Sequence, residues 1–261
     1  IETPQGPWSP KEAGKVAQEG ELHPLYWGLA NSRNNYSAWI MKQTQPQAVA
    51  DMIHKVGISS YIDPVYALCV GTPQVSVFEM AGAFSTFANR GVHTDPFFVT
   101  RIEDKQGNVL ASFSPQTHDA INEQTAYTML DMLKRVVSGG TAGRLRYQFN
   151  LTGEMGGKTG TTNNNADAWF MGVTPQVVAG TWVGGEDPAT HLLSSADGSR
   201  IALPIFGLFM SKVYKDKSLG ISMSDRFMEP IGVVKYNCDP HQVVAPIGND
   251  DSGEGGDEFF Q

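Results

Sequence analysis

Two short groups of residues combine hydroxyl groups with nitrogen-bearing side chains, and these are the parts of the chain best suited to chemistry. One is Lys158-Thr159-Gly160, at the start of a β-prone run, and the other is Ser32-Arg33-Asn34, 126 residues upstream. An ammonium group attracts a carboxylate and lowers the pKa of a neighbouring hydroxyl. A glycine lets another backbone approach a strand without a Cβ in the way. The residue types therefore indicate recognition of an anionic, peptide-like ligand.

The two motifs differ in how often they occur by chance. A chain of ordinary composition and this length contains Ser-x-Asn by chance about once, and Lys-Thr-Gly on the order of 5% of the time. Ser32 and Asn34 have the alternative interpretation of a helix cap, and residues 158–162 that of an edge strand with a glycine bulge. A phosphate-binding loop is disfavoured, because three residues separate Gly153 from Gly157 where that motif requires four.

Apolar residues at helical spacing predict the helices that position these groups. We expect a helix over residues 47–56 and a longer one that Asn122 caps and Gly139-Gly140 ends. Thr72-Pro73 predicts the start of another helix, which continues to Phe87. A mostly apolar helix is expected over residues 202–214.

Short β-prone runs separated by turn residues predict two antiparallel units. Residues 97–102 and 109–113 flank an Asp- and Gly-containing turn and predict a hairpin. Residues 158–162, 168–173 and 177–183 predict a three-stranded meander that the helix over 202–214 can cover. The expected fold class is therefore α+β, an antiparallel sheet flanked by helices.

Composition narrows the function classes. A formal charge of -8 without a basic cluster argues against a nucleic-acid partner. The six histidines show no metal-ligand spacing, and Cys69 and Cys238 stand far apart without a Cys-x-x-Cys motif, so we expect no metal and no cofactor. The two thiols are expected to be free and buried, with a disulfide as the alternative in an oxidising compartment.

The chain divides by composition into three parts. Residues 1–19 are expected to be an extended or linker segment, residues 20–237 the folded domain, and residues 238–261 a disordered acidic, Gly-rich tail. A start at Ile1 in a Pro- and Gly-containing stretch indicates an excised segment. The longest apolar run, residues 201–210, is too short to span a bilayer, so any anchor is expected outside the chain.

The motifs, in this order, resemble the penicillin-binding proteins and serine β-lactamases, whose three motifs are Ser-x-x-Lys, Ser-x-Asn and Lys-Thr-Gly. Residues 161–162, 167–170 and 182–184 extend the likeness to the class A, bifunctional penicillin-binding proteins, as do residues 81–91 and 202–204. It covers roughly residues 20–215, and nothing in it suggests the glycosyltransferase domain of class A members. The chain is thus similar to the C-terminal part of a transpeptidase domain.

The resemblance implies a penicillin-binding protein/serine β-lactamase-like transpeptidase fold and acyl transfer from D-Ala-D-Ala stem peptides, with penicillin binding. It implies catalytic roles for Ser32, as a proton relay, for Asn34, which holds the substrate amide, and for Lys158, which acts electrostatically. Substrate would bind at Thr159, Gly160, Thr161 and Thr162. The hydroxyls of Thr159 and Thr161 would take the carboxylate, Gly160 would admit the substrate backbone, and the N–H of Thr161 would enter the oxyanion hole.

One motif of the family is missing. No serine is followed three residues later by lysine, so the nucleophile and its lysine are absent, and we expect this chain alone to be inactive. By analogy with serine proteases, loss of the nucleophile removes on the order of a millionfold in turnover. Truncation of the N-terminal portion explains the absence better than degeneration, because in the family the motif precedes Ser-x-Asn by more residues than this chain provides.

The resemblance also implies partners and a location. Stem peptides and β-lactams are the expected ligands, and an N-terminal fragment of the same protein is a further candidate partner. The parent protein would be anchored in the cytoplasmic membrane, with this domain on its outer, periplasmic face. A β-lactamase or DD-carboxypeptidase, and a catalytically silent module that binds the cell wall or regulates, remain the alternatives.

Overall fold

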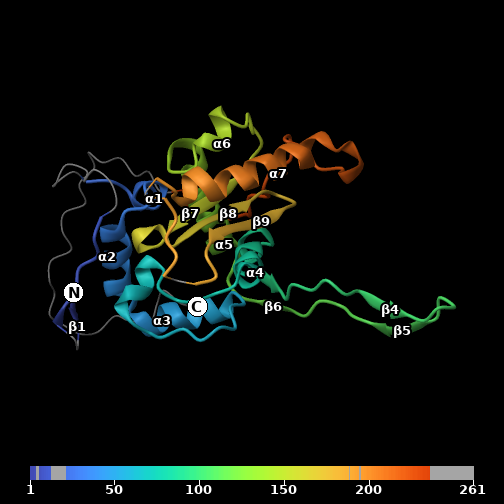
Figure 1. Cartoon of the computed structure of the whole chain (residues 1–261), viewed down its shortest axis with the longest axis horizontal. Coiled ribbons are helices and arrows are strands. Elements are labelled where there is room, and N and C mark those ends of the chain that lie inside the picture. Colours follow the sequence, from blue (N-terminus) through green and yellow to red (C-terminus); the bar gives the residue numbers. More distant parts are fainter. Residues whose placement is uncertain (4–5, 13–21, 188, 194, 236–261) are drawn as a thin grey trace.

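A computed structural model gives the fold of the chain and describes residues 1–3, 6–12, 22–187, 189–193 and 195–235 (Figure 1). Cys238, the predicted tail and part of the predicted N-terminal segment lie outside these residues. Near the start, β1 (Glu2–Thr3) pairs with β2 (Gly6–Pro7). Within the described part, no helix combines the length and apolarity needed to cross a bilayer.

The predicted meander is confirmed as an antiparallel sheet in the order β7-β8-β9. Its strands are β7 (Gly156–Thr161), β8 (Asp167–Val173) and β9 (Val178–Gly184), paired without a register shift. The turn after β7 is a short 3-10 segment (Asn163–Asn165) in which Asn164 and Asn165 have positive φ, a conformation that asparagine tolerates better than most residues. The unbroken register rules out a glycine bulge in β7.

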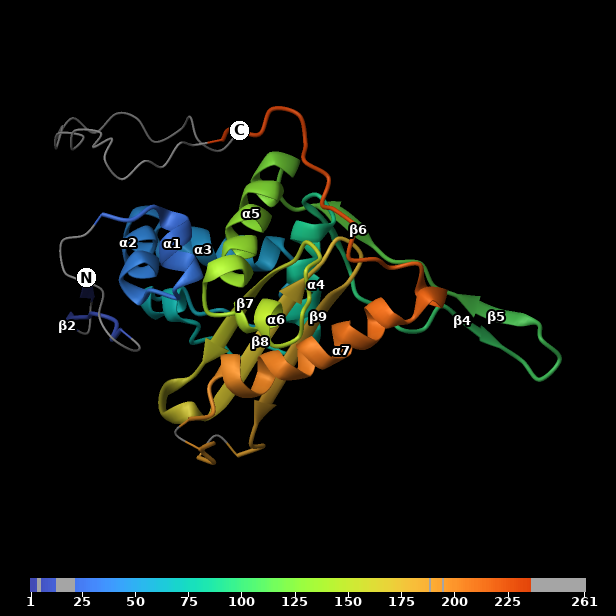
Figure 2. The same cartoon turned by 90° about the horizontal axis from the view of Figure 1, so that it is seen from above.

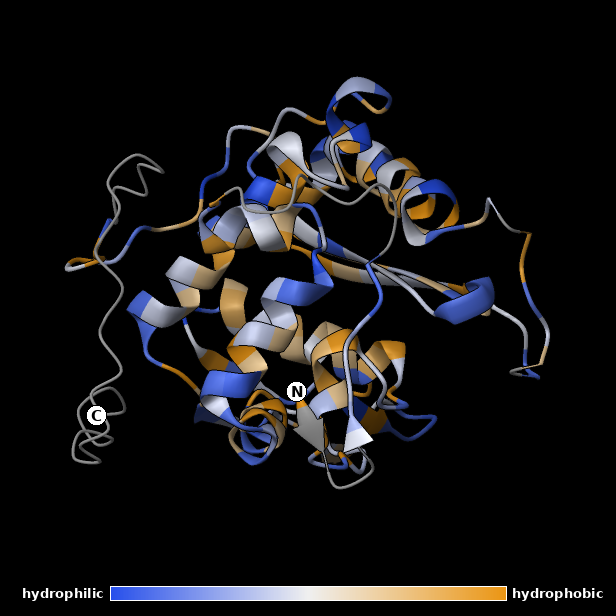
Figure 3. Ribbon diagram, turned by 90° about the vertical axis from the view of Figure 1, so that its left-hand side faces the viewer, coloured by the Kyte–Doolittle hydropathy of each residue, from blue (hydrophilic) through white to orange (hydrophobic). Residues whose placement is uncertain are grey.

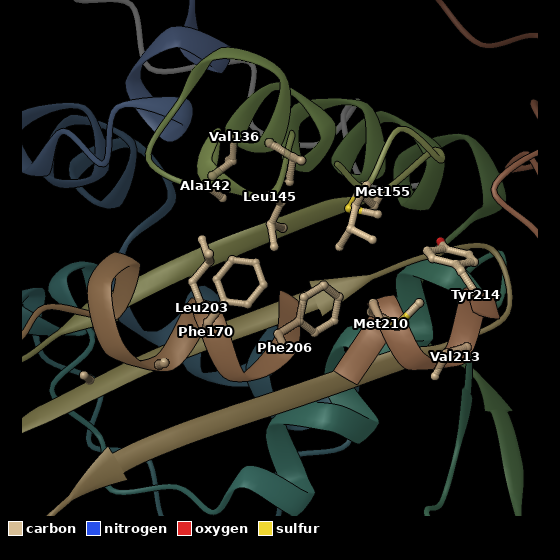
Figure 4. Packing of buried hydrophobic residues seen from close by; sticks show 14 residues of the cluster. Val136, Ala142, Leu145, Met155, Phe170, Leu203, Phe206, Met210, Val213 and Tyr214 are labelled. Atoms are coloured by element: carbon tan, nitrogen blue, oxygen red, sulfur yellow. The ribbon is translucent and has the colours of Figure 1, made fainter. Parts of the chain in front are cut away.

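One face of the sheet is covered by α7 (Leu203–Lys215), as predicted, which follows a π-helical turn (Gly198–Ala202) and precedes a 3-10 turn (Lys217–Leu219). Phe170 of β8 packs edge-on against Phe206 of α7, with ring centroids 5.1 Å apart. Gly172 is required beside them, because a Cβ there would overlap the Phe206 ring. Figure 4 shows these rings within the largest buried cluster, where α7 meets the sheet and the end of α5 (Glu123–Gly139).

The opposite face is covered by α4 (Val77–Ala88) and α5, where Leu130 and Leu133 pack with Val173 of β8. Asn122 caps α5 by accepting a hydrogen bond from the Thr125 N–H, and the helix ends at Gly139, as predicted. Apolar and polar stretches alternate along the helices (Figure 3), since each helix has a buried and an exposed side. The short α6 (Arg144–Tyr147) follows α5.

Three helices form a second packed unit beside the sheet (Figure 2). They are α1 (Leu25–Ala30), α2 (Asn34–Thr44) and α3 (Pro46–Lys55), followed by a 3-10 turn (Tyr66–Val70). The core of this unit includes Met41, Ala50 and Ile62. The prediction of α3 is confirmed, whereas α1 and α2 were not predicted.

The predicted start of α4 is wrong. The helix begins at Val77 with Ser76 as its cap, not after Thr72-Pro73. Ser76 and Glu79 form a capping box, in which each side chain accepts a hydrogen bond from the backbone N–H of the other residue. This pairing fixes the start of the helix at Val77. The Glu79 carboxylate also accepts hydrogen bonds from the backbone and hydroxyl groups of Ser59 and Ser60. It therefore ties the loop after α3 to the start of α4.

Replacing Glu79 by alanine is expected to lower the free energy of unfolding by about 1–2 kcal/mol, because the cap and the loop contacts are lost together. Hydrogen bonds, the Ser76 backbone N–H first among them, lower the pKa of Glu79 from 4.5 to about 2. The stabilisation is therefore present above pH 4.5 and is lost as the pH falls from 4.5 towards 2. Urea denaturation at pH 7 and pH 3 measures both effects.

The same substitution at Glu103, which forms an exposed ion pair with Arg101, is the control and should change stability by less than about 0.5 kcal/mol. Equal losses for the two variants at pH 7 would show that the Glu79 contacts do not hold the loop.

A β-hairpin extends far from the body of the molecule (Figures 1 and 2). It consists of β4 (Arg101–Glu103) and β5 (Val109–Ser112), which confirms the prediction with shorter strands. β3 (Val92–Thr94) pairs with β6 (Thr117–Asp119) at its base. The segment between β3 and β6, which contains the hairpin, has exposed apolar side chains that include Phe98, Leu110 and Phe113.

Candidate functional site

The two predicted groups meet although they are 126 residues apart in sequence. The Nζ of Lys158 donates a hydrogen bond of 2.8 Å to the Oγ of Ser32 and one of 2.7 Å to the carbonyl oxygen of Thr159. Lys158 lies on β7, at one edge of the described sheet, and Ser32 lies in the turn between α1 and α2. The structure thus brings together a lysine, a hydroxyl and an open strand edge.

The turn at Ser32 is held by its own backbone and by a distant carboxylate. Ser32 has a φ of 53°, and its N–H donates to the carbonyl oxygen of Leu29 at 3.1 Å. The Glu12 carboxylate accepts hydrogen bonds from the N–H groups of Asn34 and Asn35 at the start of α2, 3.2 and 2.7 Å long. A negative charge at a helix N-terminus is stabilising. Glu12 therefore fixes the end of α2 next to Ser32.

The helix-cap interpretation of Ser32 and Asn34 is wrong. The cap residue of α2 is Arg33, which makes no side-chain cap bond, and Glu12 supplies the acceptor instead. The side chain of Asn34 donates a 2.6 Å hydrogen bond to the carbonyl oxygen of Lys11. Asn34 thus contacts a peptide carbonyl beside the Ser32 turn, and not β7.

Backbone groups of β7 point away from the sheet at alternate residues. The N–H of Thr162 donates to the carbonyl oxygen of Asp167 at 3.1 Å, so that pair is hydrogen-bonded. Because hydrogen-bonded and non-bonded pairs alternate in an antiparallel ladder, the backbone groups of Thr159 and Thr161 face the open edge. The bond from Lys158 to the Thr159 carbonyl fits this assignment. The Thr161 N–H therefore points to the open edge.

Side chains of β7 alternate between the two faces of the sheet. Lys158 is paired with Met171, on the face of α4 and α5, whereas Thr159 is paired with Phe170, on the face of α7. The Oγ1 of Thr159 lies 2.9 Å from the Oγ1 of Thr141, in the loop between α5 and α6. The Oγ1 of Thr161 accepts a 3.0 Å hydrogen bond from the Gly198 N–H.

Gly160 and Thr162 have different surroundings. A Cβ at Gly160 would lie 3.2 Å from the Cβ of Trp169, so the position is tight on that face. The Oγ1 of Thr162 accepts a 2.7 Å bond from the Asp167 N–H and donates to its carboxylate at 3.2 Å. The Thr162 hydroxyl is therefore engaged in the turn between β7 and β8.

Burial lowers the pKa of Lys158 from 10.5 to about 8. Its described polar partners, a hydroxyl and a carbonyl, are both neutral, so no negative charge compensates the loss of water. At neutral pH the ammonium can attract an anion, and near pH 8 the amine can exchange a proton with Ser32. The arrangement can thus bind a carboxylate and move a proton at a hydroxyl.

The strand placement also rules out a phosphate-binding loop, because Gly157-Lys158-Thr159 lies within β7 and not in a loop that leads into a helix. Sequence reasoning missed Glu12, Thr141 and Gly198, which touch the predicted residues. Thr141 directly follows the predicted helix end at Gly139-Gly140, and that position was the one signal available for it.

Comparison with known proteins gives a consistent result. The family model described as "Penicillin binding protein transpeptidase domain" matches residues 3–210. The chain is 34% identical to penicillin-binding protein 1A of Aquifex aeolicus over 234 residues and 33% identical to that of Rickettsia bellii over 243. These alignments cover 90% and 83% of the chain but 30% of each relative. The chain therefore spans about 30% of the length of these relatives.

Solved structures have the same fold. Penicillin-binding protein 1A of Haemophilus influenzae matches with a TM-score of 0.73 at 23% identity, covering 83% of this chain and 38% of that one. The PonA1 protein of Mycobacterium tuberculosis, solved in complex with penicillin V, matches with a TM-score of 0.66 at 26% identity, covering 78% and 58%. The predicted α+β fold is confirmed by these likenesses.

Proposed function

Because the chain belongs to the penicillin-binding protein transpeptidase family, we propose that the Ser32–Lys158 site is part of the active site of a serine-type DD-transpeptidase. The observation that carries the proposal is the 2.8 Å hydrogen bond between Lys158 and Ser32, which joins two family motifs across 126 residues. The family as a whole supports acyl transfer. Serine-type chemistry, stem-peptide substrates and β-lactam binding are the finer parts of the proposal.

The proposed reaction divides between this chain and an upstream serine. The serine hydroxyl attacks the penultimate D-Ala carbonyl, the terminal D-Ala leaves with a proton on its amine, and an amine of a second stem peptide then takes the acyl group. Ser32, linked to Lys158, is suited to relay the proton to the departing amine. The Thr161 N–H at the open edge is suited to bind the oxyanion, a contact worth about 3 kcal/mol.

The remaining site residues take binding roles in this proposal. Thr159 and Thr161 donate to the substrate carboxylate, Gly160 admits the substrate backbone along β7, and Asn34 holds the substrate amide. Thr162 ends this substrate-binding edge, and its hydroxyl bonds to Asp167 in the turn. Asn34 already binds a peptide carbonyl, that of Lys11, which is the type of contact its role requires.

The proposal includes the setting of the parent protein. The domain would lie on the outer face of the cytoplasmic membrane, and an N-terminal fragment of the same protein would complete it. The domain limits would fall near residues 19 and 237, as expected from composition. The nucleophile would reside upstream, since no serine of this chain precedes a lysine by three residues.

Labelling with a fluorescent penicillin tests the proposal. We expect no covalent label on this chain and strong label on a chain extended upstream by about half a domain length. An extended chain with Lys158→Ala should label at least about 100-fold more slowly, because the carboxylate anchor and the Ser32 partner are lost. Circular dichroism verifies that each chain is folded.

If neither folded chain is labelled, the silent module becomes the better account. If label is acquired and then lost rapidly to water, the activity is that of a β-lactamase or carboxypeptidase.

A further inference from the structure

We propose that Thr141 is a positioning residue that fixes the Thr159 hydroxyl as a donor to the terminal carboxylate of the ligand. This inference rests on the proposed function, because it assigns a partner to a hydroxyl of that site. It is carried by the 2.9 Å contact between the Oγ1 atoms of Thr141 and Thr159.

The backbone around Thr141 is fixed by hydrogen bonds and by a close contact with Ala30. Its N–H donates a 3.0 Å hydrogen bond to the carbonyl oxygen of Ala30, two residues before Ser32. The preceding Gly140 lies so close to Ala30 that a Cβ there would overlap the same carbonyl group. The next residue, Ala142, donates to the carbonyl oxygen of Val136 at 3.1 Å. Thr141 thus connects the Ser32 turn to β7 through one well-seated loop.

The number of protons decides the direction of the hydroxyl contact. A hydroxyl has one proton and two lone pairs, whereas a carboxylate only accepts. If Thr159 gave its proton to Thr141, it would present a lone pair to the ligand carboxylate, which is repulsive. If Thr141 gives its proton to Thr159, the Thr159 proton is free for the ligand. Binding of a carboxylate therefore requires Thr141 as the donor.

Thr161 shows the same arrangement with a different partner. Its Oγ1 accepts a bond from the Gly198 N–H, which can only donate, so the Thr161 proton is also left for a ligand. Thr159 and Thr161 are two residues apart on one strand and therefore share a face. Each hydroxyl accepts one bond from the scaffold and keeps one proton, which suits a ligand group with two acceptor oxygens.

The test compares a ligand with and without its charge. An N-acetylated tripeptide ending in D-Ala-D-Ala and its C-terminal amide are titrated into the chain, with binding followed by NMR. We expect the wild-type chain to bind the acid more tightly than the amide. Thr141→Val, which has the same shape but no hydroxyl, should weaken acid binding about 5–10-fold and change amide binding less than about 2-fold. Thr141→Ser should restore acid binding.

Two further variants separate positioning from general structure. Thr128→Val removes a hydroxyl from the exposed side of α5, where it donates to the carbonyl oxygen of Gln124, and should leave the ratio of acid to amide affinity unchanged. If Thr141 acts through Thr159, Thr141→Val should add nothing to Thr159→Val in the double variant. If Thr141→Val alone folds poorly, Thr141→Ser and Thr141→Ala can be compared in the Thr159→Val background instead. Neither change should alter acid binding in that background.

Three results would overturn the inference. Equal losses for acid and amide would make Thr141 structural, and additive losses in the double variant would separate it from Thr159. Equal binding of acid and amide by the wild-type chain would remove the carboxylate site itself, and the proposed function would fail with it.

Discussion

Replacing Lys158 by methionine is expected to raise the free energy of unfolding at pH 7 by about 1–3 kcal/mol while it removes the proposed activity. The amine is buried and bonded to neutral groups, and burial lowers its pKa to about 8. Holding it protonated in the folded state therefore costs free energy, which a methionine of similar length does not. The proposed function of Lys158 and the stability of the folded chain therefore conflict.

The pH dependence follows from the two pKa values. Below pH 8 the amine is charged in both states, and the full destabilisation is present. Between pH 8 and 10.5 the unfolded chain binds a proton that the folded chain has released, so the stability of the wild-type protein rises with pH. Urea denaturation of both proteins from pH 7 to pH 10 should show the difference between them shrinking.

Lys134→Met is the matched control and should have the opposite sign. Burial lowers the pKa of Lys134, but the hydrogen bond and charge of Glu154, 2.7 Å away, outweigh it and raise the pKa above 10.5. Its removal leaves the half-buried Glu154 carboxylate without its cation, bonded to the Phe227 N–H, and we expect a loss of about 1–2 kcal/mol. A Lys158→Met protein that is less stable than wild type at pH 7 would show that the site compensates the charge.

Gly198→Ala is expected to lower the free energy of unfolding by about 2–4 kcal/mol. A Cβ at Gly198 would overlap the carbonyl oxygens of Gly160 and Trp169, which are backbone atoms that cannot rotate away. The π-helical turn that begins at Gly198 must then move away from β7, and the hydrogen bond from the Gly198 N–H to Thr161 is lost. Urea denaturation measures the stability, and the NMR signal of the Thr161 methyl group reports the loop.

Gly139→Ala is the control for this change. A Cβ at Gly139 meets no atom within 4 Å outside its own stretch of α5, so stability should stay equal or rise by up to about 1 kcal/mol. If Gly198→Ala costs no more than Gly139→Ala, the loop does not depend on its close approach to β7.

Local pattern was enough to predict α5, the hairpin and the meander. In α5 the buried residues recur at helical spacing between an Asn cap and a Gly end, and the strands are separated by turn residues. In α2 only Ala38 and Met41 are buried among eleven residues, so the helix has little apolar periodicity. Its start depends on Glu12, a tertiary contact that no local pattern contains.

Some residues of the candidate site could be predicted from the sequence and others could not. Ser32 and Lys158 are found by motif, and the structure brings them into contact. Thr141 and Gly198 act through single hydrogen bonds to Thr159 and Thr161, and a single bond between distant residues leaves no periodicity or composition signal. Such positioning residues can therefore be identified only from the folded structure.

The contact between Ser32 and Lys158 closes a loop of 126 residues, whereas the β7–β9 meander pairs neighbours in sequence. Loop-closure entropy grows with loop length, so we expect the meander to form early in folding and the contact between Ser32 and Lys158 to form late. The contact also lies where the helical unit with Met41 and Ile62 meets the unit with Phe170 and Phe206. A small displacement of one packed unit against the other would therefore also separate Ser32 from Lys158.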